Sequence, residues 1–218
     1  MAEPTSRLYL VTPVLEDASF APRLAEACAG GRVAAVLLRL AAADERTLTN
    51  RVKALCPPVQ EGGAAALVAV EGEAPADLAA IAVRGGADGV HVRGAEAPVR
   101  DLRERLKAER AIGAGGIRTR DDAMTLGEAG VDYLMFGEPR PDGSVPPLDG
   151  VAERVAWWAE IFETPCVAYA PDLEAVGRLA ATGAEFVALG DAVWTHPEGA
   201  AAAVAQAARL IEGQEARS

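Results

Sequence analysis

Positive charge is scarce in this sequence. It has 21 Lys and Arg residues against 32 Asp and Glu residues, which gives a net charge of -11 at pH 7. A nucleic acid or an anionic membrane surface would repel such a chain, and binding would release few counterions. No apolar run approaches the roughly 20 residues that a membrane-spanning helix needs. We therefore expect no nucleic-acid partner and no membrane partner.

Cysteine is rare as well. The three cysteines, Cys28, Cys56 and Cys166, are odd in number, far apart and free of CxxC spacing. This pattern argues against a disulfide framework and against a cysteine-based zinc site, and it indicates a reducing compartment. The opening MAEPTSR is polar and leaves no room for the apolar core of a secretory signal. We expect a cytoplasmic protein.

Three segments repeat one pattern: a helical stretch that closes on glycine, then one acid, then a short apolar run. They are RGGADGVHV at 84–92, EAGVDYLMFG at 128–137 and ATGAEFVALG at 181–190. A glycine often ends a helix by adopting the left-handed conformation, and a continuous apolar run is typical of a strand buried on both faces. The pattern predicts a helix-to-strand unit that is used repeatedly.

The residues between these segments complete a strict alternation of eight strands and eight helices. Strands are expected at 8–12, 33–40, 65–70, around His91, at 111–114, around Phe136, at 166–170 and at 186–189; helices are expected at 18–29, 44–55, 75–84, 99–110, 119–129, 151–162, 172–181 and 198–211. Such alternation requires a parallel sheet, and eight units close it into a (β/α)8 barrel. An open doubly wound sheet is the alternative, although the first strand-to-helix turn, VTPVLED, lacks its glycine fingerprint. We predict a single α/β TIM-barrel domain over 1–218, with its core at about 8–212.

Active sites of such barrels lie at the carboxyl ends of the strands. Arg39 ends an otherwise apolar strand, where its guanidinium suits a phosphate or a carboxylate; an ion pair with Glu71 is the alternative. Glu71 and Glu96 follow neighbouring strands, so their carboxylates could converge on Mg²⁺ or could simply be solvated. His91 alternates with two valines and faces either the barrel interior or the helices, as a hydrogen-bonded core histidine or as a base.

The segment GAGGIRTRDD at 113–122 superficially suggests a phosphate loop. It matches neither the G-x-G-x-x-G pattern nor the Walker pattern. We interpret its glycines as permitting a tight turn, and Asp121 and Asp122 as favourable charges in the first turn of a helix.

Five motifs occur in a characteristic order: LYLVT at the first strand, Leu-Arg at the end of the second, GADGVHV at the fourth, GVDYLMFGE at the sixth and GAEFVALGDAV at the eighth. Over residues 8–194 the sequence thereby resembles the thiamine phosphate synthase family and its barrel relatives, the thiazole tautomerases. The resemblance implies a transferase of thiamine biosynthesis that joins a pyrimidine pyrophosphate to a thiazole phosphate. It also implies that Mg²⁺ holds the departing pyrophosphate.

The sequence departs from the family pattern where the resemblance places the pyrophosphate and its metal. The family's strand-2 arginine is matched by Arg39, but the Lys two residues later is Ala41 here. The strand-5 Ser and the His after it are replaced by GAGGIR, and the loop PRPDGSVPP lacks the family's Lys. The acids at the ends of strands 3 and 4 are represented by Glu71 and Glu96, which are therefore the candidate Mg²⁺ ligands.

The cup for the thiazole phosphate is altered too. The family's Gly-Gly after strand 7 is Ala170-Pro171, and a proline has no N–H to donate. After Gly190 at the end of strand 8, Asp191 stands where the family has a small Ser-type residue. A carboxylate near a phosphate repels it in a partly desolvated site. We expect Asp191 to serve the following helix itself, as its N-cap or as a partner of its dipole.

Three functions remain open. The first is thiamine phosphate synthase, which the resemblance implies and which is our family assignment. The second is a divergent enzyme that acts on a different, non-phosphorylated small molecule, in a pocket lined by Arg39, His91 and Tyr169. The third is a catalytically silent interaction module, with Trp157 and Trp158 marking the surface of a homo-oligomer, although one of two such residues commonly packs in the core.

Overall fold

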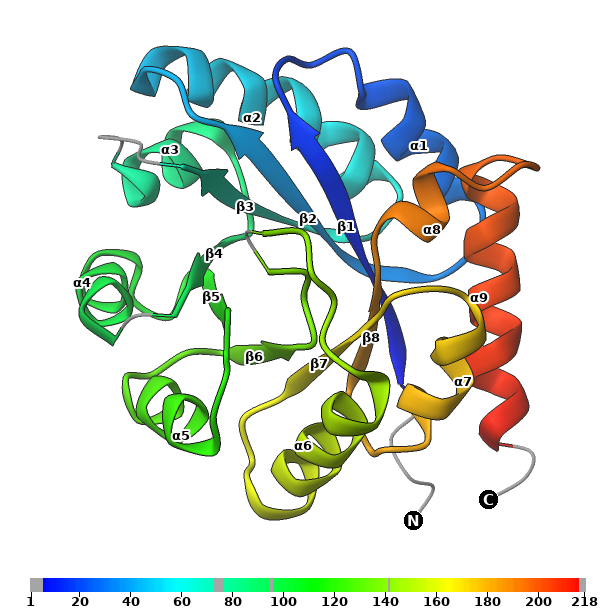
Figure 1. Ribbon diagram of the computed structural model, residues 1–218. Helices are drawn as coiled ribbons and strands as arrows, with labels where there is room; N and C mark the ends of the chain where they lie inside the picture. The colour runs from blue at the N-terminus through cyan, green and yellow to red at the C-terminus, as the bar shows by residue number, and fades with distance from the viewer. Residues whose placement is uncertain (1–5, 73–76, 95, 141, 216–218) are drawn as a thin grey trace.

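Parallel strands in chain order form the centre of the molecule, and β8 pairs with β1 to close the barrel. The structure is a computed structural model that describes residues 6–72, 77–94, 96–140 and 142–215. Helices surround the barrel on the outside (Figure 1). The predicted (β/α)8 TIM barrel is confirmed, and the open sheet is excluded.

The strands agree closely with the predicted ranges. They are β1 (Arg7–Leu15), β2 (Val33–Ala41), β3 (Ala65–Glu71), β4 (Gly89–Arg93), β5 (Ala111–Gly115), β6 (Tyr133–Phe136), β7 (Cys166–Ala170) and β8 (Phe186–Leu189). The helices are α1 (Ala21–Ala29), α2 (Glu45–Glu61), α3 (Leu78–Gly85), α4 (Glu96–Leu106), α5 (Arg120–Glu128), α6 (Leu148–Ile161), α7 (Glu174–Ala180), α8 (Asp191–Trp194) and α9 (Ala200–Glu215). The expected start of the third helix, at 75, lies outside the described residues.

Two helices differ from the prediction. α2 continues through Pro57 and Pro58 to Glu61, because Val59 in its last turn is fully buried and tertiary packing outweighs the local cost of the prolines. After β8 the structure has the short helix α8 before α9, where the sequence predicts one helix from residue 198. The indole N–H of Trp194 in α8 donates to the carbonyl oxygen of Val11 at 2.7 Å, so this turn is fastened to β1.

The repeated acid has a structural role at the amino ends of the strands. Asp88 accepts a hydrogen bond from the backbone N–H of Ala66 at 2.7 Å, and Asp132 accepts one from Ile112 at 2.6 Å. Glu185 accepts the corresponding bond from Cys166 at 2.8 Å. Each acid therefore ties the start of its own strand to the start of the preceding strand, which satisfies a backbone donor that the ladder leaves unpaired.

Apolar side chains form two layers. One lies between the strands and the helices, and the other fills the barrel interior with Tyr9, Leu37, Leu67, Met135 and further residues of the strands. Within the part of the chain that the structure describes, no helix is long and apolar enough to cross a bilayer.

Candidate functional site

A cavity of about 890 Å³ opens at the carboxyl ends of the strands, where the barrel fold places active sites. Its titratable and phenolic lining residues come from five strands or the loops after them: Arg39, Glu71, His91, Arg93, Glu138, Arg140 and Tyr169. Three of the predicted ligand-binding residues, Arg39, His91 and Tyr169, thus lie in one cavity, together with Glu71.

Arg39 and Glu71 form an ion pair at the rim of this cavity. The Nε atom of Arg39 donates to Oε1 of Glu71 at 2.7 Å, and both side chains are about one-quarter exposed, at 27% and 28%. β2 and β3 run in register at this level, because Arg39 pairs with Ala69 and Ala41 pairs with Glu71. The ion pair between Arg39 and Glu71, which the sequence analysis gave as the alternative, is therefore present. It neutralises Arg39, which the resemblance assigns to phosphate binding.

A chain of polar side chains passes through the otherwise apolar barrel interior. The hydroxyl groups of Tyr9 and Tyr133 are 2.8 Å apart, and the Tyr133 hydroxyl lies 3.0 Å from Nδ1 of His91. His91 faces the barrel interior and is only 3% exposed. The core histidine predicted as one alternative is thus found, held by a tyrosine. Burial raises the pKa of Tyr9 and of Tyr133 well above the ordinary range, so both phenols stay neutral.

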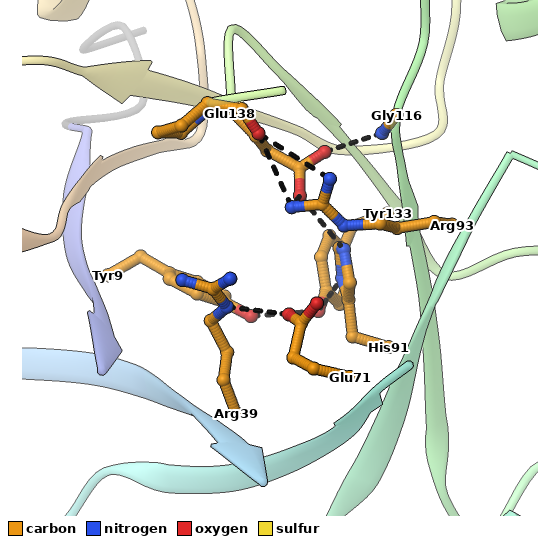
Figure 2. A network of polar contacts seen from close by, with 9 residues as sticks. Tyr9, Arg39, Glu71, His91, Arg93, Gly116, Tyr133 and Glu138 are labelled. Carbon is orange, nitrogen blue, oxygen red and sulfur yellow. Dashed lines mark hydrogen bonds and ion pairs between the residues drawn. The ribbon is translucent and has the colours of Figure 1, made fainter. Parts of the chain in front are cut away.

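The other nitrogen of His91 faces a carboxylate. Nε2 makes no hydrogen bond with any of the described residues, and it lies 3.7 Å from Oε1 of Glu138. Glu138 stands just after β6, and its side chain is 8% exposed. If the Tyr133 hydroxyl donates to Nδ1, the tautomer with its proton on Nε2 directs an N–H toward this carboxylate. Figure 2 shows His91 between Tyr133 on one side and Glu138 on the other.

Glu138 is held as an anion. Its Oε1 lies 3.4 Å from a guanidinium nitrogen of Arg93, and its Oε2 accepts a hydrogen bond from the backbone N–H of Gly116 (Figure 2). Burial alone would raise the pKa of Glu138. His91, Arg93 and the Gly116 N–H outweigh it, so the pKa of this carboxyl lies below its ordinary value.

Two glycines make room for these side chains. A Cβ atom on Gly115 would lie 2.0 Å from Oε2 of Glu138, and one on Gly113 would lie 1.9 Å from the Tyr133 ring. The glycine-rich segment therefore does more than permit a turn, because it accommodates a carboxylate and a phenol from the next strand. The sequence analysis assigned no role to Glu138. The feature that could have indicated it is an acid directly after the strand-6 glycine, opposite the glycines of strand 5.

Gly190 and Asp191 lie beside Tyr169 at the ends of β7 and β8. A Cβ atom on Gly190 would lie 2.2 Å from the Tyr169 hydroxyl oxygen. Burial, to which the Asp191 carboxylate adds, raises the pKa of Tyr169 to about 12. The prediction of Asp191 as N-cap is wrong, because Gly190 occupies the N-cap position without any side-chain bond and Asp191 is the first residue of α8. An acid there still interacts favourably with the helix dipole.

The two candidate metal ligands lie in separate ion pairs. Oε1 of Glu71 is bound to Arg39, and Oε1 of Glu96 in the first turn of α4 accepts a hydrogen bond from Nε of Arg100 at 2.6 Å. Within residues 6–72, 77–94, 96–140 and 142–215, no group of three or more His, Cys, Asp or Glu side chains is arranged to hold a metal ion. Carboxylates that are already neutralised by arginines are poor ligands for a divalent cation. The Mg²⁺ site therefore stays a prediction from the resemblance.

The tryptophan pair serves mainly for packing. Trp158 is 1% exposed, stacks on Phe162 at 4.0 Å between ring centroids and donates its indole N–H to the carbonyl oxygen of Thr164 at 2.7 Å. Trp157 is half-buried, under the guanidinium of Arg120. A homo-oligomer remains a prediction, and at most one residue of this pair offers a surface for it.

The cysteines agree with the prediction of no disulfide. Cys28, Cys56 and Cys166 are all free and buried. Burial raises the pKa of each thiol, that of Cys56 to about 12, so none of them is a reactive thiolate.

The fold and the cavity together define the class of protein: a (β/α)8 barrel with a polar, partly charged site at the carboxyl ends of its strands. The sequence profile of the family described as thiamine monophosphate synthase matches residues 8–193. The chain belongs to this family, as the motifs indicated.

Individual relatives agree with this assignment. A thiamine-phosphate synthase of Rhodospirillum centenum is 38% identical over 210 residues, which cover 95% of this chain and 98% of the relative. A thiamine-phosphate synthase of Hyphomonas neptunium is 33% identical over 220 residues, covering 96% and 95%. The solved structure of the thiamine phosphate pyrophosphorylase of Pyrococcus furiosus superimposes with a TM-score of 0.76 at 24% identity, over 97% of this chain and 98% of that chain, and confirms the fold.

Proposed function

We propose that this family member binds a small molecule of its own at the mouth of the barrel and does not join a pyrimidine pyrophosphate to a thiazole phosphate. The observation that carries the proposal is the buried, ionised carboxylate of Glu138 beside His91. Coupling the two phosphorylated compounds would require a surplus of positive charge where the pyrophosphate leaves. Glu138 adds a negative charge just after strand 6, beside the loop where the resemblance would place the pyrophosphate.

Two of the three arginines that line the main cavity are matched by acids. Arg39 is paired with Glu71, and Arg93 is paired with Glu138. Two like charges 4 Å apart repel by about 4 kcal/mol at an effective dielectric constant near 20. A pyrophosphate beside Glu138 would meet repulsion of this order, which a partner arginine offsets only in part.

The ends of β7 and β8 support the same conclusion. Ala170-Pro171 offers fewer backbone N–H groups than a Gly-Gly turn, and Tyr169 covers Gly190. Asp191 adds a negative charge in the same place. We infer that the part of the ligand at this end of the cavity is uncharged or cationic. It would find acceptors in Glu138 and Glu71, a donor in Arg39, and both in the Tyr169 hydroxyl.

Product formation decides between this proposal and the family reaction. The purified protein is incubated with the pyrimidine pyrophosphate, thiazole phosphate and Mg²⁺, and thiamine phosphate is quantified by its conversion to a fluorescent thiochrome. The Rhodospirillum centenum relative serves as the positive control. We expect the soluble, folded protein to form no product above background. We also expect that its expression in the cytoplasm of a thiamine auxotroph does not rescue growth. Steady turnover by this chain, or rescue, would refute the proposal.

A variant tests the electrostatic part of the argument. Asp191→Ser removes the carboxylate from the strand-8 end, and thiazole phosphate binding is measured by calorimetry. We expect binding to become measurable in Asp191→Ser and to stay undetectable in Asp191→Glu, which keeps the charge. Equal behaviour of the two variants would show that the carboxylate is not what excludes phosphate from this end.

Synthase activity is the second candidate function. It is favoured by relatives that carry that name and match nearly the full length of the chain at 38% and 33% identity. Arg39 at the end of β2 also matches the family pattern. The same product assay tests this candidate directly.

A further inference from the structure

Two polar atoms in the wall of the main cavity lack a close hydrogen-bond partner among the described residues. Nε2 of His91 is fully buried and unpaired within this part of the chain. Oε1 of Glu138 lies 3.7 Å from that nitrogen and 3.4 Å from a guanidinium nitrogen of Arg93, and both distances exceed the usual hydrogen-bond range of about 2.7–3.2 Å. The side chains of His91 and Glu138 are only 2% and 8% exposed, so solvent does little to satisfy either atom.

The buried tyrosines decide which nitrogen of His91 carries the proton. Among the described residues, the Tyr9 hydroxyl has a hydrogen-bond partner only in Tyr133, and the Tyr133 hydroxyl also reaches Nδ1 of His91. A proton on Nδ1 would leave one of the two buried hydroxyl hydrogens without an acceptor. If Tyr9 donates to Tyr133 and Tyr133 donates to Nδ1, every hydroxyl hydrogen is paired. Nε2 is then the protonated nitrogen, and its N–H faces the Glu138 carboxylate (Figure 2).

Glu138 keeps its charge although one of its oxygens is poorly satisfied. The backbone N–H of Gly116 donates to Oε2, and together with His91 and Arg93 it lowers the pKa of this carboxyl in spite of burial. Oε1 has no such short bond from the described chain. A buried carboxylate oxygen without a close donor costs free energy, and a ligand that supplies the donor recovers it.

The two atoms are close enough for one ligand atom to contact both. They are 3.7 Å apart, and an oxygen atom about 2.8 Å from each would form a triangle with them. Nε2 is fully buried, so the Glu138 carboxylate has to turn slightly about the bond between Oε2 and Gly116 to admit that oxygen.

Only some chemical groups satisfy both atoms. The bound atom must accept from the N–H at Nε2 and donate to Oε1, and a hydroxyl group does both. An ammonium group has no lone pair to accept, and a carboxylate or a phosphate dianion has no hydrogen to donate. An anion would also be repelled by Glu138.

Apolar side chains of the same cavity suit the rest of an uncharged ligand. Val11, Leu37 and Ala69 belong to the apolar cluster of the barrel interior and also line the main cavity. A ring or a short hydrocarbon chain that packs on them loses contact with water, which favours binding. The cavity therefore offers an apolar surface together with one donor and acceptor pair.

We propose that Nε2 of His91 and Oε1 of Glu138 together bind the hydroxyl group of an uncharged alcohol with an apolar body in the main cavity. The N–H at Nε2 donates to the hydroxyl oxygen, and the hydroxyl donates to Oε1. Tyr133 is a positioning residue, because its hydroxyl keeps the proton on Nε2. This inference rests on the proposed function, which gives the cavity a ligand other than the two phosphorylated compounds, and it names the group by which that ligand is held.

The position of the proton on His91 is tested first. The chain has two histidines, so ¹⁵N labelling of histidine gives few side-chain signals, and His196→Gln leaves those of His91 alone. Near neutral pH we expect a proton on Nε2 and none on Nδ1, in the unchanged protein and in Tyr9→Phe. Tyr133→Phe should lose this preference, and its retention would refute the positioning role. A proton on Nδ1 in the unchanged protein would overturn the proposal, whether or not Tyr133→Phe folds.

Four probes that share a benzene ring then identify the bound group. Benzyl alcohol, benzyl methyl ether, benzylamine and benzoate are titrated into the full-length protein, and the ¹⁵N signals of His91 report binding. We expect saturable binding of benzyl alcohol, with the other three at least about tenfold weaker, as for loss of a hydrogen bond to a charged group. Glu138→Ala should abolish the preference for the alcohol over the ether. Glu104→Ala, on the exposed face of α4, is the matched control and should keep it.

Three results would overturn the proposal: no saturable binding of benzyl alcohol, equal binding of alcohol and ether, or a preference that survives Glu138→Ala. Circular dichroism verifies that each variant is folded. Formation of thiamine phosphate is measured separately, because it tests the proposed function alone. A chain that makes this product and still prefers the alcohol would refute the proposed function and leave the hydroxyl site standing.

Discussion

Replacing Gly115 by alanine tests whether this glycine exists to accommodate Glu138. The backbone of Gly115 does not have positive φ, so alanine should fit the strand itself and even favour it by roughly 0.5–1 kcal/mol. Its Cβ atom, however, would lie 2.0 Å from Oε2 and 2.5 Å from Cδ of Glu138. The carboxylate would have to move away from the Gly116 N–H.

The expected cost follows from these contacts. Overpacking of a filled interior costs about 1–3 kcal/mol. Loss of the charge-assisted bond between Gly116 and Glu138 adds about 1.5–3 kcal/mol. After the gain from alanine in the strand is subtracted, we expect Gly115→Ala to lower the free energy of unfolding by about 2–5 kcal/mol.

A double-mutant cycle isolates the cause. Glu138→Ala removes the obstructing side chain, so Gly115→Ala made in that background should be neutral or slightly stabilising. The coupling energy between the two changes should then be at least about 2 kcal/mol, which is in the range for residues in direct contact. Urea unfolding followed by circular dichroism measures all four proteins.

Gly150 provides the matched control. A Cβ atom on Gly150, in the first turn of α6, would meet nothing within 4 Å, so Gly150→Ala should raise the stability by up to about 1 kcal/mol. If Gly115→Ala were tolerated as well as Gly150→Ala, or if its cost were the same with and without Glu138, the packing argument would be refuted.

Two further predictions concern the buried polar chain. Tyr133→Phe should lower the free energy of unfolding by about 2–4 kcal/mol, because it leaves the Tyr9 hydroxyl and Nδ1 of His91 buried without partners. Urea denaturation measures this loss. A loss no larger than the one caused by removing the hydroxyl of an exposed tyrosine would contradict the prediction. The pKa of Glu138 is lowered in the folded state, so its contribution to stability is complete above its unfolded-state pKa, about 4.3, and is lost as the pH falls through the lower folded value. Glu138→Gln should therefore lose less stability than the unchanged protein between about pH 5 and pH 3, and parallel pH profiles would contradict the assignment.

The sequence determined the architecture. Buried strands show as continuous apolar runs, and their alternation with helices leaves few other topologies for a parallel sheet. The glycine-acid repeat located three strands correctly, although the role of its acids as ties between strand starts needed the structure, because each acid binds the strand before its own. The family also followed from motifs that lie in order along the chain.

The composition of the site was determined only in part. Arg39, His91 and Tyr169 were recognisable because they stand at the ends of predicted strands, and strand ends meet at one face of a barrel. Whether Arg39 faces a ligand or Glu71 depends on the register between β2 and β3, which no local pattern fixes. The course of α2 past its two prolines likewise depended on burial of Val59.

Only the tertiary structure decided which charges meet. Glu138 follows β6, Gly115, which leaves room for its carboxylate, ends β5, and its partner Arg93 ends β4. A second cavity, of about 480 Å³, likewise combines residues that follow β4, β5 and β6 with Arg154 of α6. Sequence sets the number of charges and the order of the strands, whereas the pKa of a carboxyl and the sign of a cavity depend on distances of a few ångströms between residues far apart in the chain.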